Sequence, residues 1–399
     1  MKRTGTLVHI RQLCCLGISS ESLMPALLRS VREYVDADSA GFFWVDAKGE
    51  MTNLYAERML PPKLMRLYFE RHYDGEHPFR AEFLKRAQSA EGVSTTTPTP
   101  ALLKTAYYNE ILRHLDAHHV MYAVIRDQGN ALGQLSLYRP RNAPAFTAAE
   151  RAAINGITHY IAHAVMRPAQ GEMLVETASK AHSETHSETP KETRSEARSE
   201  ARSEMPGEIV SEAFAGQFVE SDQEGLVVVD GQGRIVQGTA QALNLLSMAT
   251  QPRFNRVTPP LASGDPTPET VKGLLSRLRT VLQGGESLPP RDTFETPWGR
   301  FLLSAYALSD EPEGEIGLAA IQVRRQERLV VKLAQAMHGL GLPPQQREVA
   351  LLIAQGKSNQ EIAQALSVSP NTASYHIKQL FMRLDAHERS EALQKILAS

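Results

Sequence analysis

The chain has 399 residues, of which 42% are hydrophobic and 22% are charged, and its formal net charge is −2 at pH 7. Typical domain sizes predict about three domains for this length, and the composition is that of a globular protein, not of a disordered chain or a polybasic tail. No stretch approaches the ~20 apolar residues of a membrane-spanning helix, so we expect a cytoplasmic protein without a membrane partner.

The N-terminal residues carry the only cysteines. Cys14 and Cys15 are neighbours and cannot form an ordinary structural disulfide, which indicates a reducing, cytoplasmic setting. Lys2 and Arg3 begin like a secretory signal, but His9 and two further polar residues interrupt any apolar core. We therefore expect no export.

The first domain is expected over residues 1–168. Apolar residues recur at helical spacing after Glu21, and two later pairs of strand-like segments flank short turns, which is the pattern of hairpins. Thr147 and Glu150 form a capping-box pattern that opens a further amphipathic helix, expected to run to about Met166. The elements predicted before it are a helix over 21–35 and strands over 41–45, 51–55, 121–126 and 131–138.

This order of helix, hairpin, central helices, hairpin and exit helix resembles a GAF domain. We therefore expect an α/β sensor. Aromatic side chains of this region are candidates to line a small-molecule pocket, although core packing explains most of them. These aromatics are Phe42, Phe43, Trp44, Tyr55, Tyr107, Tyr108, Tyr122 and Tyr138.

Neither a metal site nor a catalytic site is predicted. His114 and His118, like His159 and His163, are four residues apart, but a metal site needs further preorganised donors. No P-loop, kinase glycine loop or receiver-type acidic pair occurs, so we expect a protein that is not an enzyme and carries no cofactor.

Residues 169–207 are expected to form a flexible linker. Between Ser179 and Pro206, glutamates recur every four residues from Glu184 to Glu204. In a helix this spacing would place like charges beside one another, and almost nothing apolar is present for burial.

A second sensor domain is expected over residues 208–325. A strand over 221–230, a turn at Gly231–Gly233 and a second short strand resemble the opening of a PAS domain. Thr239-Ala240 stands where that family has an Asn, so a usual turn-stabilising amide is missing. The segment from Pro252 to Pro290 is rich in Pro and Gly and is expected to be partly irregular. Later strands are predicted over 293–296, 300–307 and 316–323.

The last domain, residues 326–399, is predicted to be all-α with four helices. Ser358 and Glu361 form a capping-box pattern, and after a turn at 367–369 Pro370 suits the first position of the next helix. At about 100° per residue, one face of that helix is apolar. Its inward residues are Ala373, Ile377, Leu380 and Leu384, and its outward residues are Asn371, Tyr375, Lys378, Gln379 and Met382.

Several of these residues, spread over four helices, resemble the LuxR-type helix-turn-helix. They are Arg347-Glu348-Val349, Gly356, Ser358-Asn359, Glu361-Ile362-Ala363, Thr372, His376, Leu384 and Arg389. The resemblance implies that the helix over 370–384 enters the major groove of double-stranded DNA and that the last helix helps two copies pair. The candidate DNA-binding residues are Ser358, Asn359, Asn371, Thr372, Ser374, Tyr375, Lys378, Gln379 and Arg383. The candidate pairing residues are Arg389, Ala392, Leu393 and Ile396.

Some positions depart from the LuxR pattern. Ser374 stands where the family usually has Lys, so part of the phosphate anchoring is missing or moved to Lys378. Pro343 replaces the capping Thr and leaves the first helix of the domain without a side-chain cap. No acid occurs between Ile362 and Leu384, and local charge counts more than the total. A basic lead-in is expected at Arg324, Arg325, Arg328 and Lys332.

The combined prediction is a multidomain α+β protein with two α/β sensor domains and an all-α DNA-binding domain. It would act as a sequence-specific transcriptional regulator and homodimer, with a possible ligand in a sensor and a possible contact with RNA polymerase. Acyl-homoserine lactones, which shorter LuxR-group members with one sensor bind, are not the expected ligand. Two alternatives stay open: a sigma-factor-like promoter-binding protein, suggested by Leu342 to Val349, and a ligand-binding protein whose helix-turn-helix serves only for dimerisation.

Overall fold

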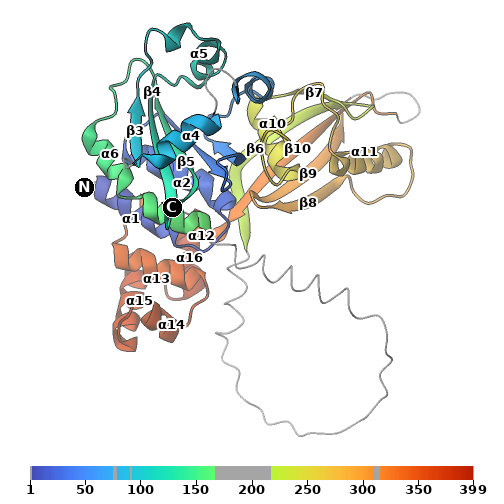
Figure 1. Cartoon of the computed structure of the whole chain (residues 1–399). Helices are drawn as coiled ribbons and strands as arrows, with labels where there is room; N and C mark the ends of the chain where they lie inside the picture. The colour runs from blue at the N-terminus through green and yellow to red at the C-terminus, as the bar shows by residue number, and fades with distance from the viewer. Residues whose placement is uncertain (1, 75–78, 90–91, 167–216, 309–314, 399) are drawn as a thin grey trace, which may run out of the picture.

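The computed structural model describes residues 2–74, 79–89, 92–166, 217–308 and 315–398. The predicted linker at 169–207 lies outside them. The structure consists of two five-stranded antiparallel sheets and a C-terminal group of helices (Figure 1). This arrangement is the multidomain α+β class predicted from the sequence. Within the described ranges, no helix is both long and apolar enough to cross a membrane.

The first sheet has the strand order β2-β1-β5-β4-β3. Both predicted hairpins are present, and the register places Phe43 between Leu54 of β2 and Gln134 of β5. A Cβ added to Gly133 would lie 2.4 Å from the carbonyl oxygen of Phe43, so this strand position requires glycine. The strands are β1 (Ser39–Val45), β2 (Met51–Ala56), β3 (Val93–Thr96), β4 (His119–Asp127) and β5 (Asn130–Arg139).

Helices cover both faces of the first sheet. On one face lie α2 (Ser20–Tyr34), α6 (Ala148–Asn155) and α7 (Thr158–Met166). The other face is covered by α3 (Pro62–Leu67), α4 (Phe79–Gln88), α5 (Ala106–Glu110), a π-helical turn at Tyr68–His72 and 3-10 turns at Leu102–Lys104 and Leu112–Leu115. In Figure 1, α5 stands at the far end of this layer.

The prediction of one helix from Thr147 to Met166 is wrong in one respect. The capping box of Thr147 and Glu150 is present, but the helix ends at Asn155, and α7 begins at Thr158. Gly156 separates the two, because glycine has low helix propensity and the break lets Ile157 become fully buried. Helix α1 (Lys2–Cys14) has no counterpart in the sequence predictions.

The second sheet repeats the strand order of the first, β7-β6-β10-β9-β8. Helix α10 begins at a cap in which Thr239 Oγ1 accepts from the N–H of Ala242 (3.1 Å), so a hydroxyl stabilises this helix start. Helix α11 lies in the segment expected to be partly irregular, with Val271, Leu274, Leu275 and Leu278 buried at helical spacing. The elements are β6 (Phe218–Asp230), β7 (Ile235–Gly238), α10 (Ala240–Thr250), α11 (Glu269–Leu282), β8 (Arg291–Thr296), β9 (Gly299–Ala307) and β10 (Leu318–Arg328).

The two sheet units share an aromatic core. Trp298, which is 0% exposed, stacks on Phe254 with 5.2 Å between ring centroids and meets Trp44 of β1 edge-on at 6.0 Å. Arg325 is buried beside it and donates to the carbonyl oxygen of Trp298 at 3.1 Å through Nε. Both units therefore contribute to one apolar junction.

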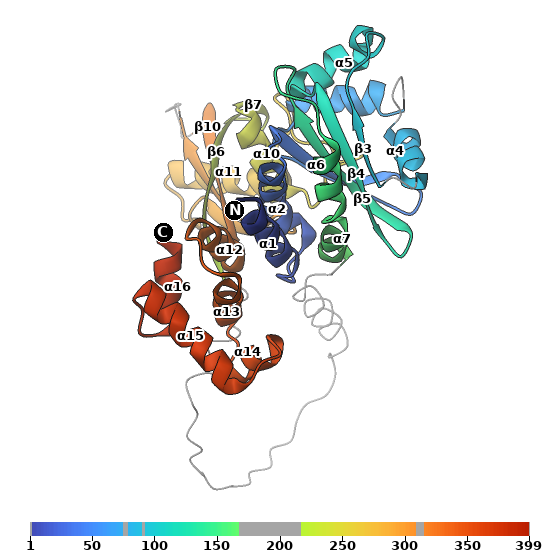
Figure 2. The same cartoon turned by 90° about the vertical axis from the view of Figure 1, so that its left-hand side faces the viewer.

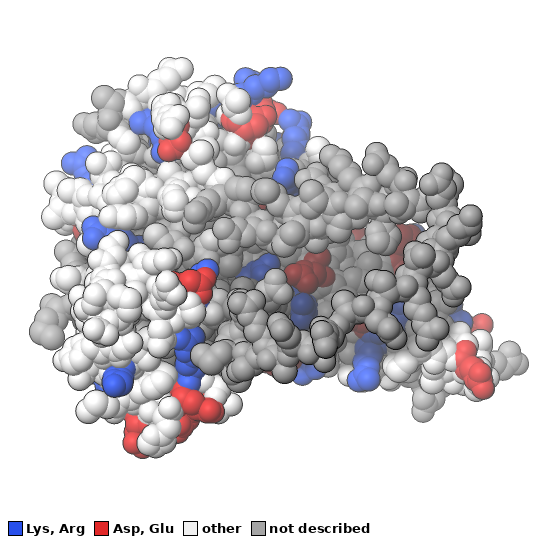
Figure 3. All heavy atoms as spheres, turned by 90° about the horizontal axis from the view of Figure 1, so that it is seen from below, with Lys and Arg blue, Asp and Glu red and all other residues white. Residues whose placement is uncertain are grey.

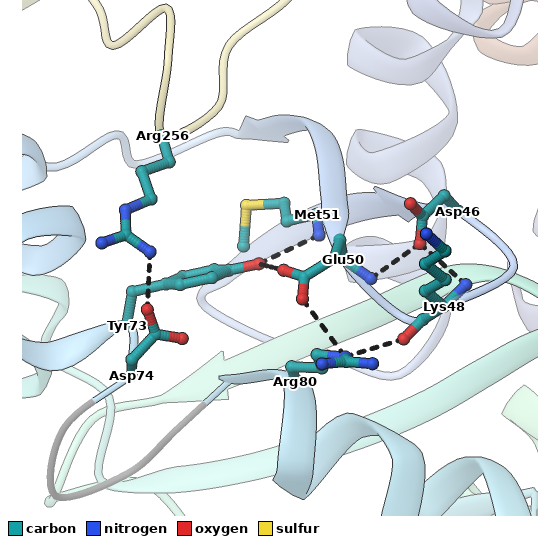
Figure 4. A network of polar contacts seen from close by, with 8 residues as sticks. All are labelled: Asp46, Lys48, Glu50, Met51, Tyr73, Asp74, Arg80 and Arg256. Atoms are coloured by element: carbon teal, nitrogen blue, oxygen red, sulfur yellow. Dashed lines mark hydrogen bonds and ion pairs between the residues drawn. The ribbon is translucent and has the colours of Figure 1, made fainter.

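Polar contacts surround this junction. Asn53 Oδ1 accepts from the N–H of Phe254 at 2.9 Å, and Arg66 forms an ion pair with Asp265. Figure 4 shows the outermost contact, in which Arg256 reaches from the second unit to Asp74 at 2.6 Å. In the same view, Tyr73 donates its hydroxyl to Glu50 and accepts from the N–H of Met51, which ties this edge to the β1–β2 hairpin.

Five helices complete the chain. They are α12 (Leu329–Gly339), α13 (Pro344–Ala354), α14 (Asn359–Ala365), α15 (Pro370–Leu384) and α16 (Arg389–Leu397). Helix α12 follows β10 directly and contacts α1, α2, α13 and α16. Figure 2 shows α12 between the sheet units and the remaining four helices, which form the lower end of the molecule. The predicted domain boundary between 325 and 326 falls inside β10.

Candidate nucleic-acid interface and sensor cavity

Helix α14 begins with two reciprocal hydrogen bonds. The N–H of Ser358 donates to Glu361 Oε2 (2.8 Å), and the N–H of Glu361 donates to Ser358 Oγ (3.3 Å), as the capping-box pattern predicts. Hydrogen bonds to its carboxylate from the backbone N–H and the side chain of Ser358, and then from Lys357, lower the pKa of Glu361 to about 2. The carboxylate is therefore ionised at neutral pH and holds the start of α14.

A tight turn leads from α14 to α15. Ser367 has a φ of 55°, a left-handed conformation that reverses the chain within the predicted turn. Ser369 Oγ then accepts from the N–H of Thr372 at 3.1 Å, and Pro370 occupies the first turn of α15. The turn and cap fix the direction in which α15 leaves α14. Helix α13 begins at Pro344, and Pro343 before it provides no side-chain cap, as expected.

Helix α15 has one buried face and one polar face. Ala373, Ile377 and Leu380 are buried against α13 and α14. On the opposite side, Tyr375 is 58% exposed and Met382 is 74% exposed. Asn371, Lys378 and Arg383 are exposed with them, while Thr372, Ser374 and Gln379 are half-buried, and Ser358 and Asn359 are exposed at the start of α14.

Charge is mixed on the surface around these helices. Figure 3 shows the molecule from below, and where grey atoms do not cover the surface, Lys and Arg are scattered among Asp and Glu. The predicted basic lead-in does not add to a DNA-facing surface at Arg325, because that side chain is buried. Lys332 donates to the carbonyl oxygen of Glu220 at 2.7 Å, and Arg328 lies over the ring of Phe218.

The candidate pairing residues make contacts inside the chain. Arg389 donates through Nη1 to the carbonyl oxygen of Lys357 (2.7 Å) and through Nη2 to Asn359 Oδ1 (2.6 Å). It therefore ties the start of α16 to the start of α14. Helix α16 packs on α12, α13 and α15, and its other candidates, Ala392, Leu393 and Ile396, are buried.

A cavity of about 340 Å³ lies beneath the helices on one face of the first sheet. Four tyrosines line it, and burial raises the pKa of each, so their hydroxyls are neutral at pH 7. The lining is otherwise mainly apolar. The aromatic lining residues are Phe43, Tyr68, Tyr107, Tyr122 and Tyr138.

Polar groups form a strip along this cavity. Arg86 Nε donates to Gln134 Oε1 at 2.9 Å, and Gln134 Nε2 donates to Ser136 Oγ at 3.3 Å. The guanidinium of Arg86 also lies 4.4 Å from the centre of the Tyr122 ring. Gln134 is 1% exposed, so the strip is fixed within the protein.

The sequence predictions identified part of this cavity. Phe43, Tyr107, Tyr122 and Tyr138 line it, whereas Phe42 and Trp44 are core residues. Tyr68, Arg86 and Gln134 were not predicted. The signal available for Gln134 was its alternation with Ser136 and Tyr138, which places three polar groups on one face of β5.

A second hollow, of about 430 Å³, lies between the two sheet units. It is lined by the end of β2, the loop after it and α10, and it shares Ala56 and Arg58 with the first cavity. Asn244 Oδ1 is buried there without a hydrogen-bond partner. The two hollows therefore lie on opposite sides of one short segment.

Three basic groups, of which His9 and Arg347 are buried and His338 is half-buried, meet where α1, α12 and α13 join. The rings of His9 and His338 are stacked with centroids 4.5 Å apart. Burial, and then the charges of His338 and Arg347, lower the pKa of His9 to about 3. Burial likewise lowers the pKa of His338 and of Arg347. These groups connect the first sheet unit with the C-terminal helices.

Among the residues that the structure describes, no group of three or more His, Cys, Asp or Glu side chains could hold a metal ion. His114 and His118 do not share a helix, because the 3-10 turn that contains His114 ends at Leu115 and His118 lies just before β4. Cys14 is buried in α1, and its burial raises the pKa of the thiol.

Two family models match parts of the chain. Residues 341–396 match the bacterial regulatory proteins of the luxR family, and residues 19–165 match the GAF domain. The chain therefore carries a luxR-family helix-turn-helix domain and a GAF domain, as the sequence predicted. The PAS-like part stays a prediction.

The chain also resembles individual proteins. It is 39% identical over 51 residues to the "Putative HTH-type transcriptional regulator YhjB" of Escherichia coli (strain K12), a match that covers 13% of this chain and 26% of that protein. The chain thus spans about a quarter of the length of this curated relative.

The solved structures that the chain resembles have low sequence identity to it. The photoproduct state of GAF3 from Slr1393 of Synechocystis sp. PCC6803 is 16% identical, with 40% of this chain and 99% of that chain covered and a TM-score of 0.31. The Vibrio cholerae VqmA dimer in the absence of target DNA is also 16% identical, with 45% and 84% covered and a TM-score of 0.17.

Proposed function

We propose that this chain, which carries a GAF domain and a luxR-family helix-turn-helix domain, is a sequence-specific DNA-binding transcriptional regulator that acts in the cytoplasm. The observation that carries the proposal is the exposed polar face of α15, which has no acid and follows a short, capped α14. A helix of this kind fits the major groove of double-stranded DNA. The proposal includes no catalytic step and no cofactor.

The side chains of α15 divide into two roles. The amides of Asn371 and Gln379 suit adenine edges, and Tyr375 can contact a thymine methyl group. Lys378 and Arg383 suit phosphates, which position the helix without reading sequence. We also assign contacts with the DNA to the side chains of Ser358, Asn359, Thr372 and Ser374.

Pairing of two copies is part of the proposal, because few cations face the DNA and a monomer would bind weakly. The pairing residues of α16 are buried in the chain, partly by α12. Pairing through Ala392, Leu393 and Ile396 therefore requires α16 to separate from α12. We propose that a signal in the sensor units shifts this equilibrium and so the spacing of two recognition helices.

The sensor regions are assigned from the cavity of the first sheet and from the strand order of both sheets. We propose that residues 1–168 form the GAF sensor, that its 340 Å³ cavity holds a small molecule, and that residues 208–325 form a PAS-like unit. The shared strand order of the two sheets supports a related architecture for the second unit. Residues 326–399 would then be the DNA-binding unit, joined through β10 and α12. Contact with RNA polymerase is compatible with this layout.

The test is recovery of genomic DNA fragments by the purified full-length protein at two salt concentrations. We expect enrichment of a roughly palindromic site, weaker at the higher salt because counterions are released on binding. Lys378→Ala should reduce recovery of this site several-fold. Lys272→Ala, which removes the same charge from exposed α11, is the matched control and should leave recovery unchanged.

Two outcomes would count against the proposal. Equal recovery by the wild-type protein and a folded Lys378→Ala variant would favour a protein whose helix-turn-helix serves only for pairing. Enrichment of core promoter elements only when RNA polymerase is present would favour the sigma-factor-like alternative.

A further inference from the structure

We propose that the cavity of the first sheet binds a small aromatic carboxylate, whose ring lies among the tyrosines and whose carboxylate pairs with Arg86 in place of Glu82. This inference rests on the proposed function, in which the cavity is the ligand site of the sensor. It adds the chemical class of the ligand, argued from the walls, the polar strip and the charges of the cavity.

The walls favour a flat ring. Phe43 and Tyr122 come from the sheet, while Tyr68 and Tyr107 come from the covering helices, so aromatic surfaces face the space from two sides. Aromatic rings gain from edge-to-face and offset contacts beyond the area that they bury. Ligand sites usually measure about 300–1,000 Å³, and the cavity of about 340 Å³ suits a ligand of one or two rings.

The polar strip places a cation at one end of this space. Arg86 is held by Gln134 at Nε and lies over the ring of Tyr122. These contacts leave the two terminal nitrogens of the guanidinium to face other groups. A guanidinium fixed in this way matches a carboxylate with two parallel hydrogen bonds, and little conformational entropy is lost on binding.

The ion pair that Arg86 already forms, with Glu82, is weak. Glu82 Oε2 lies 3.7 Å from Arg86 Nη1, one helical turn away on α4, and the Glu82 side chain is 45% exposed. A long contact of this type, with one partner close to half exposed, contributes little to stability. A ligand carboxylate inside the cavity is shielded from water and can replace Glu82.

The other charges near the cavity do not favour a cation. Arg58 also lines the space, but Asp38 binds it at 2.8 Å, so its charge is already compensated. Glu82 is the one acid among the lining residues of the described chain. An amine ligand would therefore compete with Arg86 for this single carboxylate.

The experiment compares three ligands of nearly equal size on the full-length protein by titration calorimetry at pH 7.5. They are 2-naphthoate, its neutral amide 2-naphthamide, and 2-naphthylmethylamine. We expect 2-naphthoate to bind at least about tenfold more tightly than the amide, as charge-assisted hydrogen bonds allow, and the amine to bind least.

Variants separate the roles of the charged groups. Arg86→Gln should abolish the preference for 2-naphthoate over 2-naphthamide, and Glu82→Gln should increase it several-fold, because the competing carboxylate is removed. Arg113→Gln is the matched control, since Arg113 is exposed and does not line the cavity. If Arg86→Gln fails to fold, the change in preference between 2-naphthoate and 2-naphthamide with Glu82→Gln still tests the inference.

Three outcomes would overturn the inference. Equal or tighter binding of the amide or the amine would show that the cavity is a ligand site for another chemical class, and the proposed sensor role would stand. No change in preference with Glu82→Gln would show that Arg86 is not the anchor. No binding of any of the three would reject both the class and the sensor role of the cavity.

Discussion

The imidazole rings of His9 and His338 lie nearly parallel, with 4.5 Å between their centroids and 8° between their planes. His9 belongs to the N-terminal helix and His338 to the helix that leads into the DNA-binding unit. Buried Arg347 stands near both rings, and Nδ1 of each histidine is buried without a hydrogen-bond partner. This junction joins the first and last parts of the chain through two stacked imidazoles beside a charged guanidinium.

The junction should weaken in acid. The pKa of His9 is lowered from 6.5 to about 3 in the folded chain, so the unfolded chain binds more protons between these pH values. The stability of the α1–α12 junction is therefore complete above about pH 6.5 and falls as pH decreases towards 3. The loss is at most about 5 kcal/mol at about 1.4 kcal/mol per pKa unit.

Hydrogen exchange of α1 and α12 at pH 7.5 and pH 5.0 measures this effect, after correction for the intrinsic exchange rates. His9→Phe keeps a ring for stacking and removes the titrating group, so its α1 should lose less protection in acid than the wild-type helix. Equal losses in the two proteins would mean that His9 does not control the pH response. Any acid response left in the variant is assigned to His338, whose pKa is also lowered by burial.

Arg389 should act as a structural tie within the DNA-binding unit. Arg389→Ala removes hydrogen bonds to the carbonyl oxygen of Lys357 and to Asn359, at an expected cost of about 1.5–3 kcal/mol. Amides of α14 should then exchange faster in the free protein, before any DNA is added. Arg383→Ala, an exposed change on α15, should leave that exchange unaltered. If α14 amides in Arg389→Ala were as protected from hydrogen exchange as in the wild-type protein, only the predicted role of Arg389 in pairing would remain.

The junction of the two sheets should depend on one indole ring. Trp298→Ala removes a fully buried side chain that contacts Phe254 and Trp44, at an expected cost of about 3–5 kcal/mol. In calorimetry, the sheet units should then unfold in separate transitions. Tyr306→Ala, on the exposed side of β9, should change stability by about 0.5 kcal/mol or less. A similar effect of both substitutions would contradict the role assigned to Trp298.

Two glycine-to-alanine substitutions should change the free energy of unfolding in opposite directions. Gly133→Ala places a Cβ 2.4 Å from the carbonyl oxygen of Phe43, and we expect a loss of about 1–3 kcal/mol from overpacking. Gly273→Ala in α11 meets nothing within 4 Å and should gain about 0.5–1 kcal/mol from helix propensity. Urea denaturation of both variants measures these changes in the free energy of unfolding. A stable Gly133→Ala would mean that β1 and β5 can separate at this point.

Local signals explain what could be predicted from the sequence. The capping boxes at Thr147 and Ser358 and the hairpin at 127–130 involve residues that are near neighbours in the chain, and all three are present. The outward face of α15 also follows from helical periodicity alone. These features do not depend on which other element packs nearby.

The remaining features depend on contacts between distant residues. Arg86 and Gln134 meet across the cavity only because α4 covers β5, and the sequence gives no signal for that packing. No sequence prediction concerned Trp298, although it anchors the contact between the sheets. The burial of α16 against α12 likewise depends on the position of β10, which no local pattern indicates.

The passage from β10 to α12 has no loop, since Arg328 ends the strand and Leu329 begins the helix. The strand pairs with β6 on one side and β9 on the other, so its orientation is fixed by the whole sheet. Because no flexible loop joins β10 to α12, the connection cannot absorb a rotation of α12 about its axis. Such a rotation must either change the twist of β10 or break the first turn of the helix, and both responses would carry a change in the sheet to every helix that rests on α12.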